Sequence, residues 1–187
     1  MRVLTSLFVV VLACVAASGQ KTNDTIQKQI KSLNADKAIT LTYDRGGNSS
    51  KLMGVAGNFS VSDTKMASVE AMNFGMAFFY AGQQLDASPE YINLTFWVIS
   101  KKPRFANGSA AWEVTLPSGT LHLGEYRYAG RPNENREYLN FKLLRSDLAH
   151  IASASSPVRF RLGIAQFTFT SEQIQLLRNF IALSETH

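Results

Sequence analysis

The feature that most constrains the fold is the stretch from Val158 to Leu183, in which a strand pattern gives way to a helix pattern. In its first part apolar residues alternate with Arg159, Arg161 and Gly163, which is the two-residue period of a strand with one buried face. After Gly163 the apolar positions change parity. This change predicts a bulge or a tight bend between Gly163 and Gln166.

A helix is predicted over residues 171–184, at the end of this stretch. The Thr170 hydroxyl is placed to accept a hydrogen bond from the Gln173 amide while the Gln173 side chain reaches back, which is a capping box. About half of the helix circumference is apolar at 3.6 residues per turn. The residues concerned are Ile174, Leu176, Leu177, Phe180, Ile181 and Leu183. The helix must therefore pack on an apolar surface that the preceding strands supply.

The preceding chain reads as a series of strands separated by turn residues. The segment from Val69 to Ala81 is the most regular, because bulky residues alternate with mostly small ones. The bulky residues are Met72, Phe74, Met76, Phe78 and Tyr80. We expect these bulky residues to fill the core, and we expect the small face to allow a helix or loop to approach closely. The alternative is that the Met and aromatic side chains form a platform for an apolar ligand.

Strand segments recur roughly every 10 to 15 residues without alternating helices, which is typical of all-β folds. The sequence therefore predicts a mainly β fold, a single antiparallel β-sandwich or curled sheet of about eight strands with the C-terminal α-helix packed on it. One domain is expected over residues 38–187. A polar segment over residues 19–37 precedes it, with a short helix from Asp24 to Leu33 capped by Asp24 and Gln27.

Residues 1–18 have the pattern of a secretory signal peptide. Arg2 precedes an apolar run, and small residues follow it, so cleavage is expected after Ser18 or Gly19. Cys14, preceded by an apolar and a small residue, also fits a lipoprotein signal in which the cysteine carries lipid. We expect a secreted or periplasmic protein with no transmembrane segment in the mature chain, and the alternative is an outer-envelope lipoprotein anchored at Cys14.

Cys14 is the only cysteine, so the chain cannot form an internal disulfide. Exported domains without disulfides are common in bacterial envelopes. Five Asn-X-Ser/Thr sequons would instead be glycan acceptors in a eukaryotic secretory pathway. They begin at Asn23, Asn48, Asn58, Asn93 and Asn107.

Several classes of function lack support in the sequence. Without Arg2, the chain has 18 Lys and Arg residues and 14 Asp and Glu residues, so its net charge is +4. The basic residues are scattered and form no basic helix, so nucleic acid is not expected as a partner. His122, His150 and His187 lie far apart, and no cysteine pair or Asp-rich loop accompanies them. We therefore predict neither a metal nor a cofactor. Nucleophile-elbow and phosphate-loop motifs are also absent.

The segment from Gly124 to Tyr138 has the most unusual composition, because it combines tyrosine, arginine and glutamate. Tyrosine and arginine are enriched where proteins grip partners, since they offer flat contact area and forked donors. The candidate ligand-binding residues are Tyr126, Arg127, Tyr128, Arg131, Arg136 and Tyr138. The alternative is a solvated hairpin whose opposite charges pair with little gain in stability.

Three functions remain open. The first is a non-enzymatic secreted or cell-envelope protein that binds a protein, a carbohydrate or another polymer through this segment, with help from Trp97 and Tyr91. The second is an extracellular carbohydrate-active hydrolase with a pair from Glu125, Glu134 and Glu137 as acid and base. The third is a lipid-anchored structural subunit of the envelope that docks through the bulky face of Val69–Ala81, which requires an exposed apolar patch there.

Overall fold

The structure, a computed structural model, describes residues 20–57, 59, 69–103, 105–106, 111–130, 135–155, 158–163 and 165–186, except for the side chains of Ala111 and Glu125. The predicted signal peptide with Cys14 lies outside the described residues, as do the sequon residues Asn58 and Asn107.

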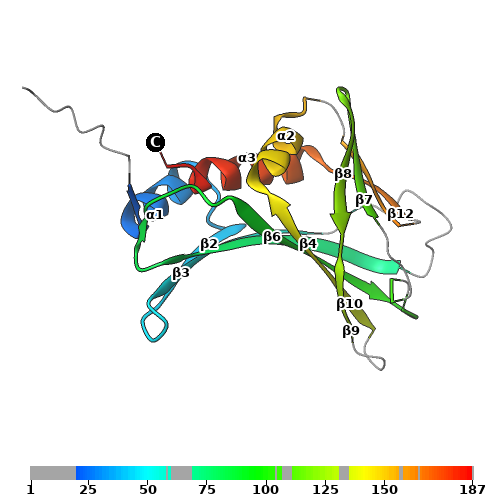
Figure 1. The fold of residues 1–187 in the computed structure, drawn as a ribbon, viewed down its shortest axis with the longest axis horizontal. Coiled ribbons are helices and arrows are strands. Elements are labelled where there is room, and N and C mark those ends of the chain that lie inside the picture. Colours follow the sequence, from blue (N-terminus) through cyan, green and yellow to red (C-terminus); the bar gives the residue numbers. More distant parts are fainter. Residues whose placement is uncertain are drawn as a thin grey trace, which may run out of the picture.

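The described residues form twelve strands and three helices (Figure 1). The long sheet has the strand order β2 (Ile39–Asp44), β3 (Ser49–Ala56), β4 (Val69–Ala81), β6 (Tyr91–Ser100), β10 (Arg136–Leu144), β9 (Arg127–Gly130). The small sheet has the order β12 (Ala165–Thr168), β11 (Arg159–Leu162), β7 (Ala111–Leu116), β8 (Gly119–Glu125). A separate pair joins β1 (Lys21–Thr22) to β5 (Gln84–Leu85), and all neighbouring strands are antiparallel.

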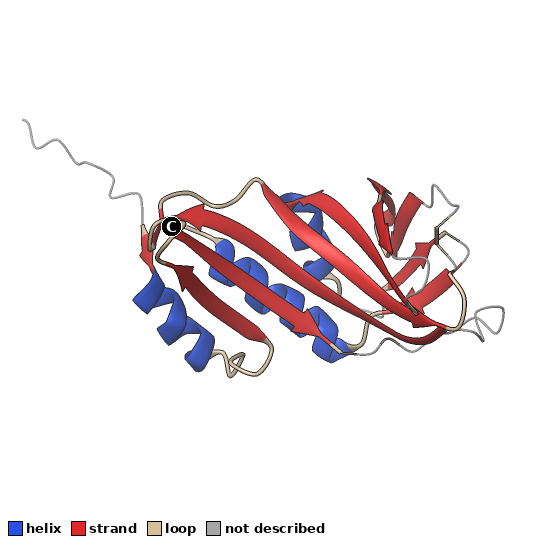
Figure 2. Ribbon diagram, turned by 90° about the horizontal axis from the view of Figure 1, so that it is seen from below, coloured by secondary structure: helices blue, strands red, loops and turns tan. Residues whose placement is uncertain are grey.

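The helices α1 (Asn23–Ser32), α2 (Arg145–Ser153) and α3 (Ser171–Ser184) lie on one side of the long sheet. The small sheet rises from the same side in Figure 1, and in Figure 2 the strands of the long sheet lie in front of the helices. We call this covered side the inner face. The opposite side is the outer face, and none of the described helices and strands covers it.

Aromatic rings between the two sheets form the centre of the core. The ring of Phe96 on β6 lies 5.2 Å from that of Trp112 on β7 and 5.6 Å from that of Phe160 on β11. Phe74 on β4 lies 5.6 Å from Phe169, which precedes α3. The contacts of Phe96 with Trp112 and of Phe74 with Phe169 are edge-to-face, an arrangement that stabilises a core beyond the burial of area. The two sheets and α3 therefore share one core.

The bulky residues of β4 fill this core, as the sequence predicts. Met72, Phe74 and Met76 are fully buried, and Phe78 is 2% exposed. The expectation that a helix or loop approaches the small face of β4 is not met by any described element. The close approach is on the inner face, where a Cβ on Gly54 of the neighbouring strand β3 would lie 3.0 Å from Cδ2 of Phe180 on α3.

The mainly β class and the docked C-terminal helix are confirmed, and α3 has the expected capping box, with Gln173 N donating to Thr170 Oγ1 at 3.2 Å. The described residues form three sheets and twelve strands rather than a single sandwich of about eight. Several strands have only two or four residues, too short to show a period in the sequence.

Three local features refine the sequence analysis. The parity change after Gly163 is a tight hairpin, since Leu162 pairs with Ala165 and Gly163 has a φ of 60°. The N-terminal helix is capped by Thr22 rather than Asp24, because β1 already ends there and the Thr22 hydroxyl accepts from Thr25 N. The α2 helix, which follows β10 directly, begins at Arg145 without a side-chain cap.

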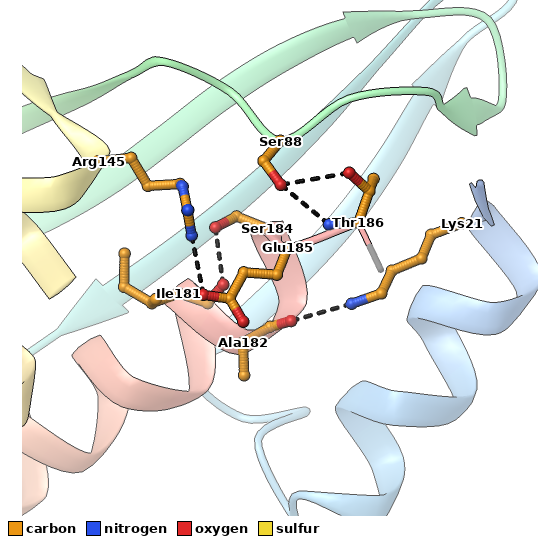
Figure 3. Close-up of polar contacts among 8 residues, drawn as sticks. All are labelled: Lys21, Ser88, Arg145, Ile181, Ala182, Ser184, Glu185 and Thr186. Atoms are coloured by element: carbon orange, nitrogen blue, oxygen red, sulfur yellow. Dashed lines mark hydrogen bonds and ion pairs between the residues drawn. The ribbon is translucent and has the colours of Figure 1, made fainter. Parts of the chain in front are cut away.

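Polar contacts hold the end of α3 in place (Figure 3). Lys21 Nζ donates to the carbonyl of Ala182 at 3.0 Å, which satisfies a free carbonyl of the last helical turn. Arg145 at the start of α2 pairs with Glu185 at 3.0 Å, and the backbone N–H of Thr186 donates to Ser88 Oγ at 2.9 Å. Burial lowers the pKa of Lys21, and the nearby side chain of Glu185 partly offsets this decrease. These contacts tie the two ends of the described chain together.

Candidate functional site

Five of the six residues predicted to bind a ligand are described, and they belong to one hairpin at the edge of the long sheet but point to both of its faces. Tyr126 precedes β9, Arg127 and Tyr128 lie on β9, and Arg136 and Tyr138 lie on β10. Successive residues of a strand point to opposite faces. Tyr126 and Tyr128 therefore point inward, and the other three point to the outer face. Arg131 lies outside the described residues.

Tyr126 has a structural role in the inner layer. Its hydroxyl donates to the carbonyl of Phe105 at 2.7 Å. Its ring packs edge-on against Phe141 at 5.8 Å and Phe105 at 6.5 Å. A tyrosine whose ring packs against the core and whose hydroxyl bonds the backbone is explained by its structural role. A role of Tyr126 in ligand binding therefore stays a prediction, and these contacts do not require it.

Tyr128 lies beside the buried carboxylate of Glu137, on the neighbouring strand. Glu137 is 1% exposed and accepts hydrogen bonds from Phe105 N at 2.8 Å and from Ser100 Oγ at 3.2 Å. Burial, and then the charge and hydrogen bond of Glu137, raise the pKa of Tyr128. A carboxylate enclosed in this way holds the backbone around it.

Trp97 on β6 and Tyr138 on β10 lie directly opposite each other in the long sheet and both point to the outer face. Neighbouring strands are about 4.8 Å apart, so the two side chains are adjacent. The Trp97 indole lies over Gly75 of β4, where a Cβ would be 3.0 Å from its Cζ3 atom. With no side chain at Gly75, the indole lies against the sheet. We call this outward pair of aromatic residues the aromatic platform.

A row of amide and hydroxyl groups continues from the platform along the same two strands. Thr95 Oγ1 donates to Asn140 Oδ1 at 2.8 Å, and Asn140 Nδ2 donates to the carbonyl of Arg127 at 3.4 Å. The next pair in the register is Asn93 with Lys142. The ammonium group of Lys142 lies 4.1 Å from the centre of the Tyr91 ring.

These residues surround a shallow depression of about 550 Å³ on the outer face, lined by Asn93, Arg127, Asn140, Phe141 and Lys142. The sequence analysis named Arg127 but missed Asn93, Asn140 and Lys142. An available signal was the alternation in β10, because Tyr138, Asn140 and Lys142 alternate with apolar residues. The site that the structure brings together is the aromatic platform with this depression.

A second depression, of about 480 Å³, lies on the small sheet. There Arg161 Nε donates to Glu113 Oε2 at 2.9 Å, and His122 Nδ1 lies 3.3 Å from Glu113 Oε1. The hydrogen bond from Arg161 is the main reason that the pKa of Glu113 is lowered. These charges satisfy one another on an exposed strand surface, which is the common role of such pairs.

The two described histidines do not come together. His122 is beside Glu113, His150 Nε2 lies 3.3 Å from Ser118 Oγ, and His187 is outside the described residues. Within the described ranges, no group of three or more His, Cys, Asp or Glu side chains is placed to hold a metal ion. Helices in the described part of the chain are also too short or too polar to cross a membrane.

Comparisons with known proteins add no relative to this description. The chain matches no protein-family model, and it matches no curated protein and no solved structure with significance.

Proposed function

We propose that this chain is a non-enzymatic, exported binding protein whose outer face holds a carbohydrate polymer. The observation that carries the proposal is the aromatic platform on a sheet face that no described element covers. Flat aromatic rings pack against the apolar faces of sugar rings, and amide and hydroxyl groups exchange hydrogen bonds with sugar hydroxyls. The platform and the row of Thr95, Asn140 and Asn93 supply both kinds of group along one line.

The other two candidate functions have weaker support. A glycosidase needs two carboxyl groups at a defined spacing on either side of the scissile bond. Of the three glutamates considered, Glu137 is buried beneath Phe105, Glu134 lies outside the described residues, and the side chain of Glu125 is not described. The envelope-subunit hypothesis required an exposed bulky face on β4, and Met72, Phe74, Met76 and Phe78 are buried instead.

Export is part of the proposal, based on the predicted signal peptide over residues 1–18. We expect the intact secreted protein to begin at Gly19 or Gln20, and mass spectrometry of the protein from the culture medium tests this. A mass that includes lipid on Cys14 would instead favour the outer-envelope lipoprotein.

The direct test of binding uses gels and resins that contain different polysaccharides. Trp97→Ala and Tyr138→Ala are expected to lower retention of the protein about tenfold or more, since buried aromatic anchors dominate binding energy. Tyr43→Ala is the matched control, because Tyr43 lies on β2 with its hydroxyl bonded to Asn48, away from the platform. Unchanged retention of both platform variants would contradict the proposal.

Tryptophan fluorescence gives an independent readout. The chain has two tryptophans, and Trp112 is fully buried while Trp97 is partly exposed. Binding at the platform is expected to shift the emission of Trp97 and to protect it from acrylamide quenching. The Trp97→Phe variant leaves Trp112 as the only emitter, so its emission should not respond. A response of equal size in this variant would place binding elsewhere.

A further inference from the structure

We propose that the polymer is an acidic polysaccharide and that its carboxylate or sulfate groups occupy the depression between Arg127 and Lys142. This inference rests on the proposed function and adds the chemical class of the ligand.

The outer face is positively charged. The outward positions of the long sheet include four cationic side chains and two acidic ones, Asp44 on β2 and Glu70 in the bulge of β4. The cations are Lys51, Arg127, Arg136 and Lys142. On β9 and β10 the described outward positions hold three of these cations and no carboxylate, so this part of the face complements an anionic partner.

None of these four cations makes an ion pair within the part of the chain that the structure describes. Lys142 lies over the Tyr91 ring and Lys51 lies 5.6 Å from the centre of the Phe79 ring. Both contacts leave the ammonium group available, since a cation over an exposed ring gains little energy. Among the described residues, these four charges are therefore not paired in salt bridges, although Glu90 hydrogen-bonds the Tyr91 side chain beside Lys142.

The depression places two of these cations where an anionic group can enter. Arg127 and Lys142 line it together with the amides of Asn93 and Asn140. Asn140 is held between Thr95 and the Arg127 backbone, which keeps β9 and its arginine next to β10. A guanidinium can bind a carboxylate or sulfate through two donors, while a lysine acts as a point charge.

The order of groups along the strands fits a chain of acidic sugars. Asn140, opposite Arg127, is two residues from Tyr138 along β10, which is roughly 7 Å at the rise of a strand. An extended polysaccharide with one sugar unit on the platform would therefore place its next sugar unit over the cations. Aromatic and cationic side chains also suit single-stranded nucleic acid, but an exported chain meets polysaccharides rather than nucleic acids.

The test compares probes of different charge with protein made in bacteria, where Asn93 in its sequon carries no glycan. The probes are heparin, polygalacturonate, neutral dextran and pullulan, a thymidine oligonucleotide and vesicles of phosphatidylglycerol with phosphatidylcholine. The variant is Arg127→Gln with Lys142→Gln. The matched control is Lys28→Gln with Arg159→Gln, which removes the same charge from exposed residues of α1 and of the small sheet.

We expect heparin or polygalacturonate to bind more tightly than every other probe, with affinity falling as salt rises. The Arg127/Lys142 variant should bind about tenfold more weakly than the wild type, because it loses two exposed charge contacts, and the control should match the wild type. Equal weakening in the control would indicate net charge alone and overturn the inference.

Failure of this inference is distinguishable from failure of the proposed function. Dextran or pullulan could bind more tightly than the acidic probes, independently of salt, with binding lost in Trp97→Ala. That result would overturn the acidic ligand but would still support carbohydrate binding at the platform. Preference for the oligonucleotide or the vesicles, or no binding to any polysaccharide, would overturn both.

Discussion

Glu137 is an acidic side chain that is buried in the protein, next to the edge strand of the long sheet. It lies on β10 opposite Val98, and its carboxylate accepts the backbone N–H of Phe105 at 2.8 Å. A buried backbone N–H without an acceptor is costly. The carboxylate therefore stabilises the segment around Phe105, to which Tyr126 also bonds.

Replacing Glu137 with leucine is expected to lower the free energy of unfolding by about 1–3 kcal/mol, because Phe105 N loses its acceptor in a buried place. Glu137→Gln keeps an acceptor oxygen and should lose less. Urea unfolding at equilibrium measures both. Glu70→Leu, at an exposed position, is the control. Similar small decreases in the free energy of unfolding in all three variants would contradict the role of Glu137 as the acceptor for Phe105 N.

Gly54 allows α3 to approach β3 closely, because a Cβ there would lie 3.0 Å from the Phe180 ring and 3.2 Å from Met76 Cε. We expect Gly54→Val to lower the free energy of unfolding by about 1–3 kcal/mol through overpacking. Gly57→Val is the matched control, since no atom lies within 4 Å of a Cβ at that glycine. A Gly54→Val protein as stable as the wild type would show that α3 moves away at little cost.

The helix α3 shows how a single element is attached to the sheets. Gln173 completes the capping box with Thr170, and its Nε2 also donates to the carbonyl of Gly57 at 3.0 Å. The cap therefore both begins the helix and fixes its first turn to the end of β3.

Thr170→Ala is expected to lower the free energy of unfolding by about 1 kcal/mol, because the N–H of Gln173 loses its acceptor. Ser171→Ala, at the next and exposed position, should change it by less than about 0.5 kcal/mol. Thermal and urea unfolding both measure the difference. Equal effects of the two substitutions would mean that the hydroxyl of Thr170 has no specific role.

The elements differ in how far the sequence predicts them. The start of α3 is predictable because capping depends on residues three apart, and both partners are in view in the sequence. The direction in which the Tyr126 side chain points is not predictable from the sequence, because it depends on contacts with Phe105 and Phe141, which are distant in the chain. On β10 the alternation separates inward from outward residues, but nothing local says that the outer face stays uncovered.

At the scale of the molecule, the long sheet separates two environments. Its inner face packs on α3 and the small sheet through a continuous aromatic core, which fixes the direction of every strand residue. Its outer face keeps Trp97 and Tyr138 side by side, next to a depression with two cations. The packing of the inner face thus fixes the strand register that brings these outward residues together as a candidate binding surface.

Amide chemical-shift mapping tests the central claim most directly. A short oligosaccharide of the tightest-binding polysaccharide is added to isotopically labelled protein. We predict the largest shifts at the Trp97 indole and at the backbone amides of Tyr138, Asn140 and Arg127. Shifts confined to the small sheet around Arg159 and Arg161, or no shifts at saturating ligand, would contradict the assignment of binding to the outer face.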